Sequence, residues 1–79
     1  MYYVYVLKNL EGRYYIGYTS KDPQQRTVEH NSSKSRWTRY KGPWTLVYSE
    51  EFSTKENAFK RELQIKSYKG GEAFKKLIH

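Results

Sequence analysis

The sequence contains no cysteine, so no disulfide bond can hold the fold together. A chain of 79 residues buries only about 60–65% of its unfolded surface on folding, so its core is modest. That core must be stabilised by packing alone or by a partner. The lack of cysteine also fits a reducing compartment, and the N-terminus begins like a strand rather than like a signal peptide. We expect a cytoplasmic protein.

Long apolar runs are absent as well. No stretch approaches the ~20 apolar residues of a membrane-spanning helix, and no expected helix has the broad Trp/Leu face of one that lies on lipid. Acidic residues are few: 8 Asp and Glu stand against 15 Lys and Arg, for a net charge of +7. This excess of positive charge indicates a polyanionic partner, and we expect nucleic acid rather than a membrane.

Helix and strand signals predict one domain over residues 1–79, in the order β-β-α-β-α-α. Asp22-Pro23 is typical of a helix start, Ser53 to Glu56 of a capping box that opens a second helix, and Gly70-Gly71 of a helix end. The pattern indicates an α+β layer fold. The expected strands cover 2–8, 13–19 and 43–52, and the expected helices cover 23–31, 54–69 and 72–78.

The first two strands are expected to pair through a tight hairpin. Its loop has three residues, with Gly12 as the bulge residue. This loop places Tyr5 opposite Gly17, and it also places Leu7 opposite Tyr15. Tyr5 and Tyr15 then share one face of the sheet, and Gly17 leaves room between them. A slip of one residue would move the two tyrosines to opposite faces.

The second expected helix carries an acid within its apolar stripe. On a helical wheel Ala58, Phe59, Leu63 and Ile65 form the stripe, and Glu62 falls inside it. Two interpretations stay open. The carboxylate can lie at the edge of the stripe and pair with a Lys, since acids are rarely buried alone. It can instead point into a site, as a ligand for a divalent metal or as a base.

The first expected helix places Arg26 and His30 four residues apart, and therefore on one face. The pair can be a solvated face, or a phosphate clamp beside a proton-transfer group. After this helix, residues 34–41 combine four cations with two aromatic side chains. Such a loop can contact phosphates and stack bases, or it can serve solubility with its Trp folded onto the core. The residues expected to bind nucleic acid are Lys34, Arg36, Trp37, Arg39 and Lys41.

Two triplets, Tyr3-Val4-Tyr5 and Tyr15-Ile16-Gly17, resemble the paired triplets of the GIY-YIG nucleases. That family includes the N-terminal nuclease domain of a bacterial excinuclease and the catalytic domains of some homing endonucleases. The first triplet keeps only Tyr5, and the second is intact. The resemblance covers nearly the whole chain and is closest to the short stand-alone bacterial members. It implies a small three-stranded antiparallel sheet flanked by helices.

Arg26 with His30 also matches the family's helix motif, and Glu62 stands where the family places its metal-binding glutamate. The resemblance implies that Tyr15 acts as general base on the attacking water and that Tyr5 orients this network. It implies that Glu62 holds a divalent cation, Mg²⁺ or Mn²⁺, which polarises the phosphate. Arg26 would neutralise charge on the phosphoryl oxygens, and His30 would assist proton transfer or bind the phosphate.

The resemblance implies a metal-dependent endonuclease that hydrolyses phosphodiester bonds. We expect DNA as its substrate and a role in DNA repair. We also expect a protein partner that supplies substrate specificity. The alternative is a catalytically weak nucleic-acid-binding module that keeps the fold; a protein-interaction domain is a third hypothesis. Two positions depart from the family pattern. Many members have a Lys where this chain has Tyr18. Many also have an Asn downstream of the metal-binding glutamate, whereas no Asn follows Asn57 in this chain. Both bear on catalytic strength.

Replacing Arg36 and Arg39 by Ala is expected to weaken DNA binding for all sequences alike, because phosphate contacts carry no sequence information. The slope of log affinity against log salt concentration should fall by roughly 0.9 for each phosphate that the variant no longer binds. Fluorescence anisotropy over a salt series measures this slope. An unchanged slope would assign the stretch to solubility.

Overall fold

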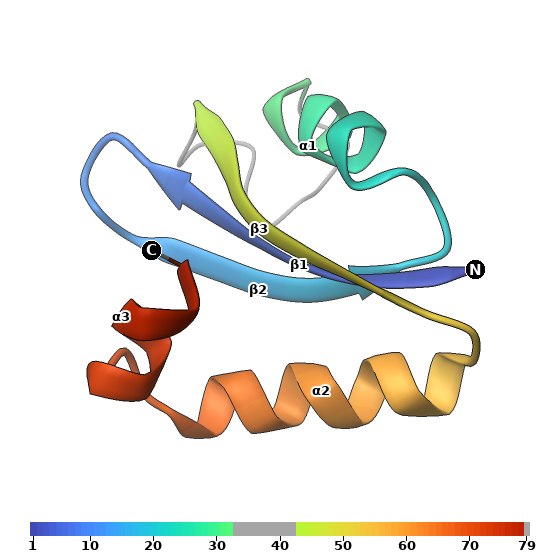
Figure 1. Cartoon of the computed structure of the whole chain (residues 1–79). Helices are drawn as coiled ribbons and strands as arrows, with labels where there is room; N and C mark the ends of the chain where they lie inside the picture. The colour runs from blue at the N-terminus through green and yellow to red at the C-terminus, as the bar shows by residue number, and fades with distance from the viewer. Residues whose placement is uncertain (33–42, 79) are drawn as a thin grey trace.

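The three strands form one antiparallel sheet with the first strand at its centre (Figure 1). β1 (Tyr2–Asn9) pairs with β2 (Tyr14–Thr19) on one side and with β3 (Trp44–Phe52) on the other. The structure is a computed structural model that describes residues 1–32 and 43–78. The expected fold class, an α+β sheet flanked by helices in the order β-β-α-β-α-α, is confirmed.

The helices cover both faces of the sheet. α1 (Pro23–Asn31) lies on one face, while α2 (Lys55–Ser67) and α3 (Glu72–Ile78) lie on the other (Figure 1). Asp22 caps α1 as expected, because its side chain accepts a hydrogen bond from the Gln24 amide at 2.9 Å. Within residues 1–32 and 43–78, no helix has the length and apolar character needed to cross a bilayer.

The expected ends of α2 are each off by one or two residues. The N-cap is Thr54 rather than Ser53, and its side chain accepts a hydrogen bond from the Asn57 amide at 3.2 Å. The helix ends at Ser67 because the left-handed turn begins at Lys69, whose φ is 52°, one residue before the glycine pair.

The predicted hairpin register is confirmed. Tyr5 pairs with Gly17, and Leu7 pairs with Tyr15. The turn is fixed by Asn9, whose side-chain oxygen accepts hydrogen bonds from the backbone amides of residues 11 and 13 at 3.0 and 2.8 Å. Gly12 has a φ of 82°, a conformation that glycine adopts without strain.

The central strand is buried on both sides, and residues 4–7 are all nearly inaccessible to solvent. Since side chains alternate along a strand, Val4 and Val6 point towards α2, whereas Tyr5 and Leu7 point towards α1. The core on the α2 side also contains Ala58, Ile65 and Phe74. The core on the α1 side also contains Trp44. The two small cores share β1, so a change in its register would disrupt both.

The apolar stripe expected on α2 is correct only in part. Ala58 and Ile65 are fully buried, but Phe59 is 45% exposed and Leu63 is 49% exposed. At about 100° per residue these two side chains lie about 100° and about 140° around the helix from Ala58. Glu62 lies closer to the centre of the buried face and is itself buried. Tertiary packing therefore selects a narrower face than hydrophobicity alone predicts.

Pairing between β1 and β3 contains a bulge. Val6 pairs with Tyr48 but Leu7 pairs with Leu46, so Val47 is an extra residue in β3. The bulge sends Leu46 to the α1 side and Tyr48 to the α2 side. At its beginning, β3 is tied to α1 through Asn31, whose side-chain amide makes two hydrogen bonds, of 2.6 and 3.0 Å, to the backbone of Trp44.

Candidate active site

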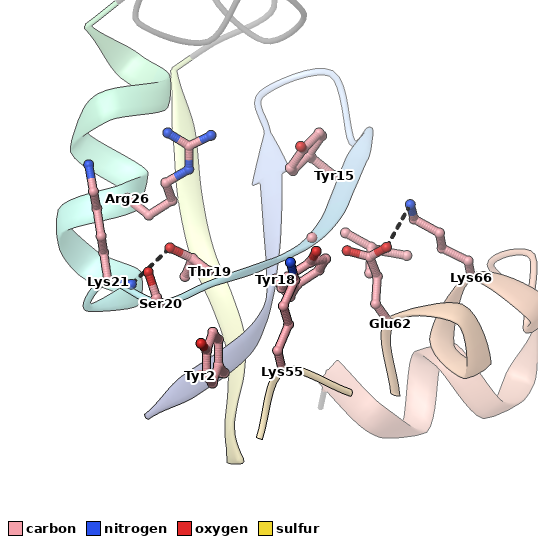
Figure 2. Close-up of a pocket in the computed structure, with 12 residues that line it drawn as sticks. Tyr2, Tyr15, Tyr18, Thr19, Ser20, Lys21, Arg26, Lys55, Glu62 and Lys66 are labelled. Atoms are coloured by element: carbon pink, nitrogen blue, oxygen red, sulfur yellow. Dashed lines mark hydrogen bonds and ion pairs between the residues drawn. The ribbon is translucent and has the colours of Figure 1, made fainter. Parts of the chain in front are cut away.

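A pocket crosses the outer edge of β2. In the described part of the chain this strand has one neighbour, β1, so its other edge is open. The pocket passes over the open edge from the side chains of α1 to those of α2 (Figure 2). The residues that line it are Tyr2, Tyr15, Ile16, Gly17, Tyr18, Thr19, Ser20, Lys21, Arg26, Lys55, Glu62 and Lys66.

The structure places the five expected catalytic residues together, but at two depths. Tyr15, Arg26 and Glu62 line the pocket. Tyr5 and His30 lie behind it, and both are fully buried. The expected nucleic-acid-binding residues, Lys34, Arg36, Trp37, Arg39 and Lys41, lie outside the described residues.

Tyr5, His30 and Tyr15 form an aromatic cluster on the α1 side of the sheet. The Tyr5 hydroxyl and His30 Nε2 are hydrogen-bonded at 2.9 Å. The Tyr15 ring centroid lies 4.8 Å from that of His30 and 6.1 Å from that of Tyr5. The two buried side chains therefore hold the Tyr15 ring at the back of the pocket.

Burial sets the protonation states of the two inner residues. Burial, with a further contribution from Tyr15, raises the pKa of Tyr5 far above its usual value, so its hydroxyl keeps its proton. Burial and the nearby Arg26 charge lower the pKa of His30 to about 4, so its ring is neutral at neutral pH. A buried neutral ring is suited to orienting Tyr5, whereas direct phosphate binding by His30 requires an exposed ring.

The position of Arg26 is fixed by a residue that the sequence analysis missed. Glu29 is buried; its Oε1 accepts from Arg26 Nη1 at 2.9 Å, and its Oε2 accepts from Lys21 Nζ at 2.8 Å. Hydrogen bonds from Lys21 and then Arg26 hold the pKa of Glu29 down at about 2, so the carboxylate stays charged. The spacing of three residues between Arg26 and Glu29 in one helix could have predicted their ion pair. The contact between Glu29 and Lys21 depends on tertiary structure and could not have been predicted from spacing.

On the opposite wall, Glu62 is paired with Lys66. The distance between Oε2 and Nζ is 3.2 Å, and the Lys66 side chain is half exposed (Figure 2). This ion pair matches the interpretation in which Glu62 pairs with a Lys. The Glu62 side chain also lines the pocket, so the second interpretation, a carboxylate that points into a site, stays open. The Lys66 ammonium can turn to solvent, but the Glu62 carboxylate is nearly buried and then needs another cation in its place.

Positive charge dominates the pocket. Among the residues that the structure describes, four cations line it, Lys21, Arg26, Lys55 and Lys66, against the one carboxylate of Glu62. Counting Glu29 behind the wall still leaves an excess of positive charge. A concave surface of this sign attracts phosphate groups. Lys21 reaches the pocket through tertiary structure, so no sequence spacing could have identified it, whereas Lys55 stands seven residues before Glu62 on the same side of α2.

Gly17 allows the two tyrosines to meet over β2. A Cβ atom at this position would lie 3.0 Å from Tyr15 Cε1 and 3.0 Å from the Tyr5 hydroxyl oxygen. Since Tyr5 is buried and hydrogen-bonded to His30, it has little room to move. The second triplet thus requires glycine for space.

Gly17→Ala is expected to destabilise the fold by about 1–3 kcal/mol, the usual cost of overpacking a core. Chemical denaturation measures this loss. The matched control is the same substitution in a Tyr5→Phe background, where the hydroxyl that meets the new methyl group is absent. A double-mutant cycle should show the cost reduced there. Equal costs in both backgrounds would show that the hydroxyl is not the obstacle.

The buried neutral His30 predicts a pH dependence of stability. Its folded pKa of about 4 lies below the unfolded value of 6.5, so the unfolded chain binds a proton that the folded chain does not. The stabilisation that comes from the neutral His30 should therefore be fully present above pH 6.5. The free energy of unfolding should fall as pH drops towards 4, by up to about 1.4 kcal/mol per pH unit. Glu29 contributes a separate loss between its unfolded pKa of 4.5 and its folded pKa of about 2.

Denaturation of the wild type and His30→Gln at several pH values isolates this effect. Between pH 6.5 and 4.5 the variant should show a shallower slope, because its side chain does not titrate. Identical slopes would contradict the assignment.

Comparisons with known proteins agree with this geometry. Residues 1–75 match the sequence model of the GIY-YIG catalytic domain. The UPF0213 protein SERP0126 of Staphylococcus epidermidis is 41% identical over 68 residues, which cover 85% of this chain and 82% of that protein. The UPF0213 protein VNG_2274C of Halobacterium salinarum is 43% identical over 67 residues, which cover 84% and 86%.

A solved structure is also similar. The solution NMR structure of the UPF0213 protein BH0048 from Bacillus halodurans has 36% sequence identity and a TM-score of 0.50, with 92% of this chain and 90% of that chain covered. Tyr5, Tyr15-Ile16-Gly17, Arg26 and Glu62 all fall within the matched domain. The chain therefore belongs to the GIY-YIG nuclease family, and its relatives are the short UPF0213 proteins.

Proposed function

We propose that the chain is a divalent-metal-dependent endonuclease that hydrolyses phosphodiester bonds, with DNA as its substrate. One observation carries the proposal: a tyrosine hydroxyl, a guanidinium and a carboxylate, from Tyr15, Arg26 and Glu62, line a single pocket rich in positive charge. Phosphodiester hydrolysis needs a group that takes a proton from water and groups that stabilise phosphoryl charge.

The residues present suit Mg²⁺ or Mn²⁺ better than a metal that needs a full protein cage. Among the described residues, no group of three or more His, Cys, Asp or Glu side chains gathers in one place. Mg²⁺ is commonly held by one or two carboxylates, with water and substrate phosphate completing its shell. Glu62 provides one hard anionic oxygen pair at the pocket wall. The donor set therefore fits a cation shared between Glu62 and the substrate.

The protein side chains divide the remaining work. Arg26, held by Glu29 at 2.9 Å, balances the charge that develops on the phosphoryl oxygens. Tyr15 acts as general base in its phenolate form: the phenolate oxygen takes the proton of the attacking water and becomes a hydroxyl. Tyr5 and His30 keep the Tyr15 ring in place. A bound metal ion supplies Lewis-acid polarisation of the phosphate and of water.

Substrate choice forms part of the same proposal. The net charge of +7 and the cation-lined pocket support binding through phosphates, which gives affinity without sequence specificity. We therefore include in the proposal a protein partner that directs the enzyme, a role in DNA repair and the cytoplasmic location expected from the sequence. Lys66, which pairs with Glu62, is the feature that favours the alternative, a weak nucleic-acid-binding module.

Glu62→Gln is expected to abolish Mg²⁺- and Mn²⁺-dependent cleavage while the fold persists. Gln is nearly isosteric, so packing against Ala58 and Ile65 survives, but a neutral amide is a poor ligand for a hard cation. The melting temperature should hold or rise, because functional sites often cost stability. Cleavage of plasmid and branched DNA, with melting curves of the same preparations with and without Mn²⁺, tests both statements.

Lys66→Gln is the matched control, because it removes the same ion pair and leaves the carboxylate in place. Cleavage should persist in this variant, and Mn²⁺ should raise its melting temperature at least as much as that of the wild type. If Glu62 serves only the ion pair, the two variants will behave alike in both assays. A wild-type chain that binds but cuts no DNA or RNA would favour the binding module.

A further inference from the structure

A second hollow adjoins the pocket and is aromatic where the pocket is polar. It is lined by Tyr18, Lys55, Glu56 and Phe59. Tyr18 and Lys55 also line the pocket that holds the expected catalytic side chains. The two hollows are therefore neighbours that share a wall, and the aromatic ring of Phe59 has no role in the proposed hydrolysis.

Phe59 and Tyr18 form one aromatic unit. Their ring centroids lie 5.9 Å apart in an edge-to-face arrangement, with an interplanar angle of 71°. Tyr18 packs partly on the core beneath α2, which fixes the pair from below. Phe59 nevertheless remains 45% exposed. An exposed ring beside a cation-lined groove is the arrangement that stacks nucleobases in proteins that bind single strands.

The helix spacing continues this arrangement towards the reaction centre. Lys55, Phe59, Glu62 and Lys66 follow one another at intervals of four, three and four residues, so they lie along one side of α2. At 1.5 Å per residue, Phe59 stands about 4.5 Å along the helix axis from Glu62. A nucleic-acid strand that runs along this side of α2 would pass a cation, an aromatic ring, a carboxylate and a second cation, in that order.

We propose that Tyr18 and Phe59 form a stacking subsite for a nucleobase of the nucleotide next to the phosphate that the cation proposed at Glu62 would hold, with Lys55 contacting the adjoining phosphate. The subsite takes a base that is not stacked within a duplex, because both rings lie against α2 and β2 rather than on a protruding loop. The position of the scissile phosphate rests on the proposed function; the base-binding surface itself does not. Tyr18 then contributes base recognition.

Binding without cleavage tests the subsite separately from catalysis. In EDTA, the wild type should bind a short single-stranded oligonucleotide about 5- to 150-fold more tightly than a strand of equal length made of abasic sugar phosphates, since each stacked base contributes ~1–3 kcal/mol. Phe59→Leu should lose most of this difference while keeping salt-dependent affinity for the abasic strand. Phe59→Trp should keep or increase it.

Leu63→Ala is the exposure-matched control. Leu63 is 49% exposed on the same helix but lines neither hollow, so its loss should leave base-dependent binding unchanged. Equal losses in Phe59→Leu and Leu63→Ala, or no preference of the wild type for the base-bearing strand, would overturn the subsite. A wild type that cuts no nucleic acid but shows Phe59-dependent base binding would refute the nuclease proposal and support the subsite.

Discussion

The site depends on the absence of a side chain at position 17. Tyr5 and Tyr15 come from different strands and meet over Gly17, where a Cβ atom would lie 3.0 Å from both. The Tyr15 ring also packs against His30, with centroids 4.8 Å apart, and Gly17 lines the pocket at the open edge of β2. Arg26 from one face of the sheet and Glu62 from the other can then reach the same space (Figure 2). A thin edge strand thus joins the two helical layers into one site.

Charge pairing keeps this site both positive and ordered. Glu29 binds Arg26 and Lys21 at 2.9 and 2.8 Å, so two cations are fixed on the α1 wall before any phosphate arrives. Glu62 and Lys66 are coupled more loosely, across 3.2 Å and beside solvent. The difference matches the work proposed for each wall. In the proposed function, the α1 wall is preorganised for phosphoryl charge, while the α2 wall would exchange the Lys66 ammonium for a metal ion.

Local chemistry in the sequence was enough to predict much of the fold. Gly12 and the tyrosine spacing give the hairpin register, and Asp22-Pro23 gives the start of α1, because each depends on neighbours in the chain. The bulge at Val47 depends on how β3 meets β1, and no sequence period reveals it. The same limit explains Phe59 and Leu63: they are apolar, yet the sheet covers only the side of α2 that carries Ala58 and Ile65.

Some residues of the site could be predicted from the sequence, and others are placed there only by tertiary packing. Tyr15, Arg26 and Glu62 stand at positions that the family resemblance identifies, and the pocket brings them together. The burial of His30 and the position of Lys21 at the pocket follow from how β2 packs between α1 and α2. Sequence spacing predicts contacts within one helix or one hairpin, but it cannot predict which helix faces meet across a strand edge.

The central claim is that Glu62 and the β2 edge hold a divalent cation, and Mn²⁺ titration followed by amide NMR tests it most directly. Mn²⁺ broadens resonances close to it. If Glu62 holds the cation, the amides of Gly17, Tyr18 and Glu62 will broaden first, the hairpin tip at Leu10 will be unaffected, and Glu62→Gln will abolish the effect. Broadening that spreads evenly over the exposed carboxylates, or that persists in Glu62→Gln, would contradict it.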